Sequence, residues 1–206
     1  MIKSYRENDR PEPASKFVTA MASRQGVSLD RSAPVRIVDD PMRDEDVPAF
    51  MKSFDAVVST HRSEGFGLTP FYAMALGVPV VATDYGGVTD FCCDDTAWLV
   101  DVDRMTEPSG EEKKIFGHLR GIQWAEPSLE SAKAMLRECF SNEAERDKRV
   151  QKGRSLVADH FSYARCASAL TDAFNAAMPN CLSKTVPAQS FVNEKFEGDP
   201  FKMLEL

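Results

Sequence analysis

The sequence lacks the features that would point to a membrane, a secretory route or a nucleic acid. No apolar stretch approaches the about 20 residues that a transmembrane helix needs. The N-terminal segment MIKSYRENDRPEP has no apolar core like that of a signal peptide. Basic residues are scattered, and 32 acidic residues outnumber 25 basic ones, whereas a nucleic-acid surface needs a dense cationic face. We therefore expect a soluble chain with no transmembrane segment and no nucleic-acid partner.

Cysteine is sparse and poorly spaced for disulfides or zinc. The chain has five cysteines, an odd number, and none of them form a Cys-x-x-Cys pair. Cys92 and Cys93 are adjacent, which suits neither an ordinary disulfide nor a tetrahedral zinc site. We expect free thiols in a reducing compartment, no metal site and a cytoplasmic location.

Short apolar runs alternate with helical patterns in the first half of the chain. Strands are predicted at residues 35–38, 55–60, 78–83 and 97–100, and a helix follows the loop at about 68–76. The continuous apolar runs are typical of buried parallel strands. Strands that alternate with helices over short loops predict a Rossmann-like α/β fold, with a parallel sheet covered by helices on both faces. Such sheets bind ligands at the carboxyl ends of their strands.

The second half of the chain is predicted to be mostly helical. The polar stretch 103–122 is interpreted as loop, and helices are expected at about 129–140 and 143–160, with a third capped by Ser162. Residues 1–178 would form one lobe. Residues 179–206 mix Pro, Ser, Asn, Lys and Glu and are interpreted as a poorly ordered tail.

The segment SEGFGLTP at residues 63–70 lies between a predicted strand and a predicted helix. Gly65 and Gly67 allow the backbone to turn sharply and to approach a ligand closely. The amides of Leu68 and Thr69 begin the helix, lack intrahelical acceptors and suit a phosphate. This combination indicates an anion site at the start of the helix.

Glu64 precedes the same helix, so its carboxylate can reach over the same crevice. An acid beside a phosphate site fits a neutral, hydroxylated group such as a sugar. Taken alone, a glycine pair before a helix is weak evidence, and an ordinary loop explains it as well. Pro70 stands where a third glycine would be needed, which argues against a dinucleotide fingerprint.

Three further stretches extend the motif. HRSEGFGL at 61–68 is followed by AMALGVPVVATD at 73–84, then by Gly86-Gly87-Val88, and later by Trp-Ala-Glu-Pro at 124–127. Together they resemble family 4 of the glycosyltransferases, and the last phrase resembles its bacterial cell-surface polysaccharide members. The resemblance implies a GT-B enzyme with two Rossmann lobes and a retaining mechanism. This chain would be the C-terminal, donor-binding lobe, and the N-terminal, acceptor-binding lobe would lie outside it.

The resemblance also implies a donor site, made of a catalytic residue, Glu64, and the donor-binding residues Lys3, Met42, Gly65, Phe66, Gly67, Leu68, Thr69 and Tyr72. Glu64 would bind the hydroxyls of the donor sugar. The amides of Phe66 and Gly67 would line the sugar, and those of Leu68 and Thr69 would hold the diphosphate. The donor would be a UDP-sugar or a GDP-sugar, with no metal and no other cofactor. Stabilisation of the leaving group would be electrostatic.

Three residues of this implied site lie outside the loop. Lys3, at the end of a strand, would pair with the phosphates, and the turn around Met42 would lie against the base. Tyr72 stands eight residues after Glu64, where the family has a second glutamate that holds the ribose. It would either stack on or hydrogen-bond to the nucleotide, or pack on the helix surface. The family's phosphate-binding arginine, expected before Lys3, lies outside the sequence.

Other conspicuous side chains are given ordinary interpretations. His61 is expected to order the loop, and Trp98 and Trp124 are expected to be packing residues. Glu126 is interpreted as a solvated or capping acid.

Two functions remain open on this evidence. The first is a hexosyltransferase-type enzyme that transfers a sugar from a nucleotide sugar to a glycan or another acceptor, once a separate acceptor-binding lobe or chain completes it. The second is a degenerate, non-catalytic lobe that binds a nucleotide sugar or is only a structural remnant. Glu64 and the glycine loop favour binding, whereas Tyr72 favours a degenerate site.

Overall fold

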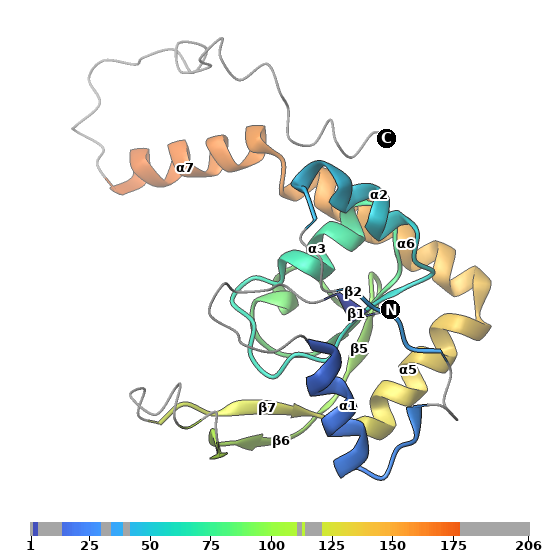
Figure 1. The fold of residues 1–206 in the computed structure, drawn as a ribbon. Coiled ribbons are helices and arrows are strands. Elements are labelled where there is room, and N and C mark those ends of the chain that lie inside the picture. The colour runs from blue at the N-terminus through green and yellow to red at the C-terminus, as the bar shows by residue number, and fades with distance from the viewer. Residues whose placement is uncertain are drawn as a thin grey trace. The chain divides into compact units, whose positions relative to one another are not determined.

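The computed structural model of the protein describes residues 2–3, 14–29, 34–38, 42–110, 113 and 121–177 (Figure 1). The chain divides into two compact units, Met1–Val47 and Pro48–Leu206, and each is described by itself. The predicted tail at 179–206 lies outside the described residues, and a single lobe over residues 1–178 stays a prediction.

The first unit contains a short parallel strand pair and a helix. Strand β1 (Ile2–Lys3) pairs with β2 (Ile37–Val38). Helix α1 (Ala14–Arg24) lies between them in the sequence, and the 3-10 helix η2 (Asp44–Asp46) follows β2. The strand predicted at 35–38 is therefore shorter than expected.

The second unit is built on a three-stranded parallel sheet with the order β3-β4-β5. The strands are β3 (Val57–Ser59), β4 (Val80–Thr83) and β5 (Trp98–Val100). All of β4 is buried, as its apolar sequence predicts for a central strand. The continuous burial expected of residues 55–60 is wrong, because β3 lies at the edge of this sheet and Val58 is 46% exposed.

Helical segments precede, alternate with and follow these strands along the chain. They are α2 (Val47–Lys52), α3 (Leu68–Ala75), α5 (Leu129–Ser141), α6 (Glu143–His160) and α7 (Tyr163–Ala177), with the 3-10 helix η3 (Gly86–Asp90). Helix α3 contacts β3, β4 and α6, whereas α5 contacts β4, β5 and α6. The parallel sheet with flanking helices confirms the predicted α/β class.

Polar caps begin the three C-terminal helices. The side chain of Ser128 accepts a hydrogen bond from the Ser131 amide at the start of α5. Asn142 does the same for α6. Ser162 accepts from the Arg165 amide at 3.3 Å, which confirms the cap predicted for α7.

A β-hairpin replaces part of the predicted loop at 103–122. Strand β6 (Val102–Thr106) pairs antiparallel with β7 (Trp124–Pro127). The interpretation as loop is wrong for residues 103–106 because the polar side chains of this strand face solvent, where polarity is compatible with a strand. Its partner lies about 20 residues further along the chain, so no local pattern reveals the pairing.

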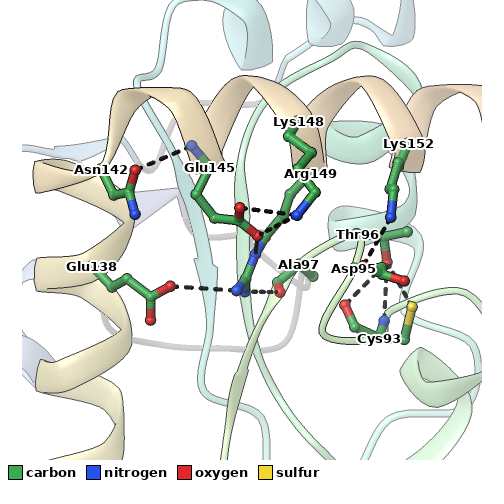
Figure 2. Close-up of polar contacts among 10 residues, drawn as sticks. All are labelled: Cys93, Asp95, Thr96, Ala97, Glu138, Asn142, Glu145, Lys148, Arg149 and Lys152. Atoms are coloured by element: carbon green, nitrogen blue, oxygen red, sulfur yellow. Dashed lines mark hydrogen bonds and ion pairs between the residues drawn. The ribbon is translucent and has the colours of Figure 1, made fainter.

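Arg149 of α6 joins α5 and α6 to the residue that precedes β5 (Figure 2). Its guanidinium donates to the Ala97 carbonyl oxygen at 2.8 Å. It also pairs with Glu145 at 3.0 Å and with Glu138 of α5 at 3.3 Å, and it lies 4.8 Å from the Trp98 ring centroid. We call these five residues the Arg149 cluster. Trp98 lies within this cluster and is fully buried, which confirms its predicted packing role.

Candidate functional site

The loop that leaves β3 enters α3 through a strained position that only glycine suits. Gly67 has φ 91°, and a Cβ there would lie 2.6 Å from the Cγ2 atom of Val88. Its carbonyl oxygen accepts the first hydrogen bond of the helix, from the Phe71 amide at 2.9 Å. The requirement for a glycine at this point of the sequence motif is therefore steric.

The start of α3 has two amide groups that lack an intrahelical acceptor. Leu68 and Thr69 are the first residues of the helix, so their N–H groups have no intrahelical acceptor. Pro70 follows and has no N–H, and both Leu68 and Thr69 are exposed. The first turn also contains no acidic residue. This helix end is thus suited to an anion.

The turn after β4 lies directly against the loop after β3. The Gly87 amide donates to the Glu64 carbonyl oxygen at 3.1 Å. A Cβ on Gly87 would lie 1.9 Å from the Gly65 carbonyl oxygen, and one on Gly86 would lie 2.6 Å from that of Glu64. The two glycines therefore allow backbone to pack on backbone. This contact brings Glu64 and the 83–87 turn together at the carboxyl ends of neighbouring parallel strands.

His61 orders the loop, as the sequence predicted. Its Nε2 atom lies 2.8 Å from the carbonyl oxygen of Tyr85, and its Nδ1 atom lies 3.2 Å from the Ser59 hydroxyl. The Nδ1 atom also lies 3.2 Å from the Ser59 carbonyl oxygen. His61 thus connects the end of β3 with the turn after β4.

Glu64 is half-buried beside the start of α3. Within residues 42–110 and 121–177, no hydrogen bond or ion pair of its carboxylate is found. Its backbone is held by Gly87, whereas its carboxylate oxygens have their acceptor capacity available. A fixed backbone with an available acceptor suits the binding of hydroxyl groups.

Phe66 and Tyr72 differ in where their rings lie. The ring of Phe66 belongs to an aromatic cluster with Phe71, Phe91 and Phe161, at centroid distances of 5.0, 5.3 and 6.1 Å. Its ring thus packs within the protein, although Phe66 is only half-buried. Tyr72 contacts Phe71 edge-on at 6.1 Å but is 42% exposed. That position is compatible with both interpretations of Tyr72, and its role stays a prediction.

Lys3 and Met42 belong to the first unit. Lys3 ends β1, as the sequence predicted, and the structure describes its backbone. Met42 is half-buried just before η2. Their roles toward phosphate and base stay predictions.

Residues of the hairpin that the sequence did not connect with the loop contact Arg62. Glu126 was interpreted as a solvated or capping acid, and this is wrong, because its carboxylate pairs with Arg62 at 2.8 Å. The Trp124 ring lies under the guanidinium at 4.9 Å, in addition to any packing role. The only sequence signal was the Trp-Ala-Glu-Pro phrase, which gave no partner for these side chains.

The described part of the chain contains neither a metal cluster nor a membrane-spanning helix. There, no three His, Cys, Asp or Glu side chains come together as a metal site. None of the helices in that part is both long enough and apolar enough to cross a membrane.

Comparison with known proteins supports the motif and the fold. Residues 38–110 match the sequence model of the family described as "Glycosyl transferases group 1". A stretch of 44 residues, 21% of this chain, is 52% identical to the lipopolysaccharide core biosynthesis mannosyltransferase LpsB of Rhizobium meliloti. That match covers 12% of LpsB, so the similarity is strong but short.

Solved structures show the same fold at low sequence identity. Sucrose-phosphate synthase from Thermosynechococcus elongatus is similar with a TM-score of 0.59 and 17% identity, over 86% of this chain and 38% of that one. Anabaena HepE in complex with UDP-glucose has a TM-score of 0.52 and 17% identity, over 79% of this chain and 36% of HepE. This chain thus spans well under half the length of either protein.

These comparisons confirm the resemblance drawn from residues 61–84. The predicted Rossmann-like α/β fold is also confirmed, because it is similar to the folds of these solved structures. The motif at residues 61–84 lies inside the segment 38–110 that matches the group 1 glycosyltransferase model.

Proposed function

We propose that this lobe binds a nucleoside-diphosphate sugar at the loop 61–69 and serves a retaining glycosyl transfer. The observation that carries the proposal is one arrangement of three features: a helix start with two amides that lack an intrahelical acceptor, a neighbouring carboxylate with available oxygens, and a backbone fixed by Gly87. Each feature suits a different part of the donor.

The diphosphate would bind at the start of α3. The amides of Leu68 and Thr69 would donate to its oxygens, and the positive end of the helix dipole would add to the attraction. An anion at such a site gains about 0.3–1 kcal/mol, or up to about 2 kcal/mol when partly buried.

The sugar would lie over Glu64. Hydroxyl groups are donors that match a carboxylate, and bonds to a charged acceptor contribute about 1.5–3 kcal/mol each. The backbone of Gly65, Phe66 and Gly67 would line the same sugar. Because the loop is already held in place, binding would cost little reorganisation.

Catalysis would rest on the leaving diphosphate. As the bond to the anomeric carbon breaks, negative charge grows on the phosphate oxygens, where amide donors in fixed positions stabilise it. Glu64 would hold the sugar in the orientation that this step requires. The acceptor would come from a separate lobe or chain, which this proposal requires for turnover.

The donor would be a UDP-sugar or a GDP-sugar. HepE supports the first through its complex with UDP-glucose, and the mannosyltransferase LpsB leaves the second open. The ribose would lie near Tyr72. A cytoplasmic location is supported by the free thiols of Cys92, Cys93, Cys139 and Cys166, which suit a reducing compartment.

Titration calorimetry of the full chain with UDP, GDP, UDP-glucose and GDP-mannose tests the proposal. We expect weak binding of one nucleotide and its sugar, and no sugar transfer by the chain alone. Absence of all binding at millimolar concentration would refute a donor site. Transfer by the purified chain alone would refute the requirement for a separate acceptor lobe.

A specific observation favours one alternative, a degenerate lobe that binds nucleotide sugar without transfer. Tyr72 replaces the carboxylate expected to hold the ribose, and its ring already contacts Phe71. Loss of that charged acceptor would weaken donor binding by about 1–2 kcal/mol, or roughly 5- to 30-fold. Binding without transfer after addition of a competent acceptor lobe would favour this alternative.

A further inference from the structure

Arg62 connects the loop with the β6–β7 hairpin through its side chain. Its Nη2 atom lies 2.8 Å from the Glu126 carboxylate and 3.2 Å from the Thr106 hydroxyl oxygen. Its guanidinium lies 4.9 Å from the centroid of the Trp124 ring. We call these four residues the Arg62 cluster. The two strands of the hairpin therefore both contact one side chain of the loop.

The backbone of Arg62 is held by the same hairpin. The Ala125 amide donates to the Arg62 carbonyl oxygen at 2.9 Å, and Ala125 is fully buried. Side chain and main chain of one residue are thus fixed together, which restricts both the position and the direction of the peptide that follows. That peptide leads to Ser63 and Glu64.

The ion pair is more than a mobile surface contact. The side chains of Arg62 and Glu126 are only 31% and 32% exposed. The Thr106 hydroxyl lies 3.4 Å from the same Glu126 oxygen, so the pair is part of a small network. Networks with several partners hold a geometry better than isolated surface pairs, which contribute little.

Polar contacts attach the loop at three residues, in addition to the packing of the Phe66 ring. His61 bonds to the Tyr85 carbonyl oxygen, and the Glu64 carbonyl oxygen accepts from Gly87. Both of these attachments lead to the turn after β4. Arg62 provides the third, and it leads to a different element, so it opposes displacements that the other two permit.

We propose that Arg62 is a positioning residue for Glu64, and that the β6–β7 hairpin is the support through which it acts. In this proposal, Arg62 contacts no atom of the nucleotide sugar. It fixes the loop before the ligand arrives, as outer residues fix the direct contacts of other sites. The inference rests on the proposed function for what the loop binds, whereas the support itself is tested without ligand.

Hydrogen exchange of the unliganded full chain tests the support. Arg62→Ala should speed amide exchange of residues 63–67 by about 10-fold, because one of the attachments is removed. Exchange in β4 and β5 should stay unchanged. Arg104→Ala is the matched control, since this arginine lies on the same hairpin with a side chain 66% exposed. Unchanged exchange at 63–67 in Arg62→Ala would overturn the proposal.

Calorimetry then separates positioning from general stability. Arg62→Ala should weaken binding of the nucleotide sugar by about 10-fold. This is the lower end of the range for residues that orient a direct ligand contact. The free nucleotide should be nearly unaffected, because its contacts are to the helix start. Glu126→Gln should act in the same direction. Arg62→Lys should be intermediate, because it keeps the charge but not the planar guanidinium.

The outcomes distinguish this inference from the proposed function. Wild-type chain that binds neither UDP-glucose nor GDP-mannose would defeat the proposed function, and the exchange experiment would still decide the role of the hairpin. Equal weakening of nucleotide and nucleotide sugar by Arg62→Ala would mean a structural role only, and would overturn the inference while leaving the donor site in place.

Discussion

Arg149 and Arg62 make nearly the same contacts in two regions of the second unit. Each guanidinium lies over a tryptophan, at 4.8 and 4.9 Å from the ring centroid, and each pairs with a glutamate of another element. They differ in burial, because the side chain of Arg149 is 13% exposed and that of Arg62 is 31% exposed. They also differ in what they join. Arg149 holds two helices to the sheet, whereas Arg62 holds a loop to a hairpin.

Similar contacts therefore do not imply similar roles for these two arginines. Arg149 bonds to the Ala97 carbonyl oxygen beside the buried Trp98, so its removal would disturb the core. Removal of Arg62 would leave the core intact and release a loop that borders the candidate site. We therefore expect Arg149 to determine stability and Arg62 to determine binding.

The largest effect is expected from Arg149→Ala. Its removal leaves Glu145 and Glu138 without their main partner and the Ala97 carbonyl without its donor. We expect a loss of about 3 kcal/mol in the free energy of unfolding, measured by urea denaturation. Arg154→Ala, at an exposed position of the same helix, should lose little. A loss below about 1 kcal/mol for Arg149→Ala would end the contrast between the two regions.

Gly87→Ala should lower stability nearly as much as Arg149→Ala, and it acts at the loop that borders the candidate site. The new Cβ would lie 1.9 Å from the Gly65 carbonyl oxygen, a backbone atom that cannot rotate away. Overpacking of this kind costs about 2–3 kcal/mol of stability, and it should displace Glu64 and abolish donor binding. Gly65→Ala is the matched control, because a Cβ there meets nothing within 4 Å. Equal unfolding midpoints for the two variants would contradict the close backbone contact.

Tyr72→Glu tests the candidate site through an expected increase in nucleotide affinity rather than a decrease. If the lobe holds a ribose at this position, a carboxylate could accept from both ribose hydroxyls. Nucleotide binding should then tighten by about 1–2 kcal/mol, measured by calorimetry. Weaker or unchanged binding would mean that Tyr72 is a packing residue and that the ribose assignment fails.

A smaller stability effect is expected from Arg62→Ala. The cluster is partly exposed, so we expect a loss of about 1 kcal/mol in the free energy of unfolding. The affinity for the nucleotide sugar should fall relative to that for the free nucleotide, by more than this loss of stability alone would cause. A loss as large as that of Arg149→Ala would place both arginines in the core and remove the distinction between them.

The smallest effect concerns acid pH. The pKa of Glu145 is lowered from its usual 4.5 by hydrogen bonds from Arg149 and then from Lys148. Stability from this pairing is complete above pH 4.5 and is lost as pH falls through the lowered pKa of the folded state. The stability difference between wild type and Arg149→Ala should therefore shrink below that pH. Urea denaturation across this range measures it, and a constant difference would contradict the pairing.

Most of the parallel sheet and one side of the site could be predicted from sequence. The apolar run at 78–83 gives a buried central strand, and Ser162 caps its helix. The loop 63–70 was expected between strand and helix, as observed, because glycines and helix starts leave local signals. These features depend on residues that are close together in the chain.

The rest depends on contacts between distant residues. Arg62 and Glu126 lie 64 positions apart and carry no shared pattern that would pair them. The contact of Gly87 with Gly65 is likewise visible only after folding, although the glycine motif hinted at a close approach. The strand at 102–106 was missed because its stability comes from a partner about 20 residues away.

The most direct test of the account is calorimetry of Glu64→Ala with a nucleotide sugar and with its free nucleotide. Glu107→Ala, at an exposed glutamate of the same unit, is the control. The proposed site predicts that Glu64→Ala weakens the nucleotide sugar by about 10-fold, equivalent to about 1.4 kcal/mol, and leaves the free nucleotide almost unchanged. Unchanged affinity for the nucleotide sugar, or an equal loss for both ligands, would contradict the assignment of Glu64 to the sugar.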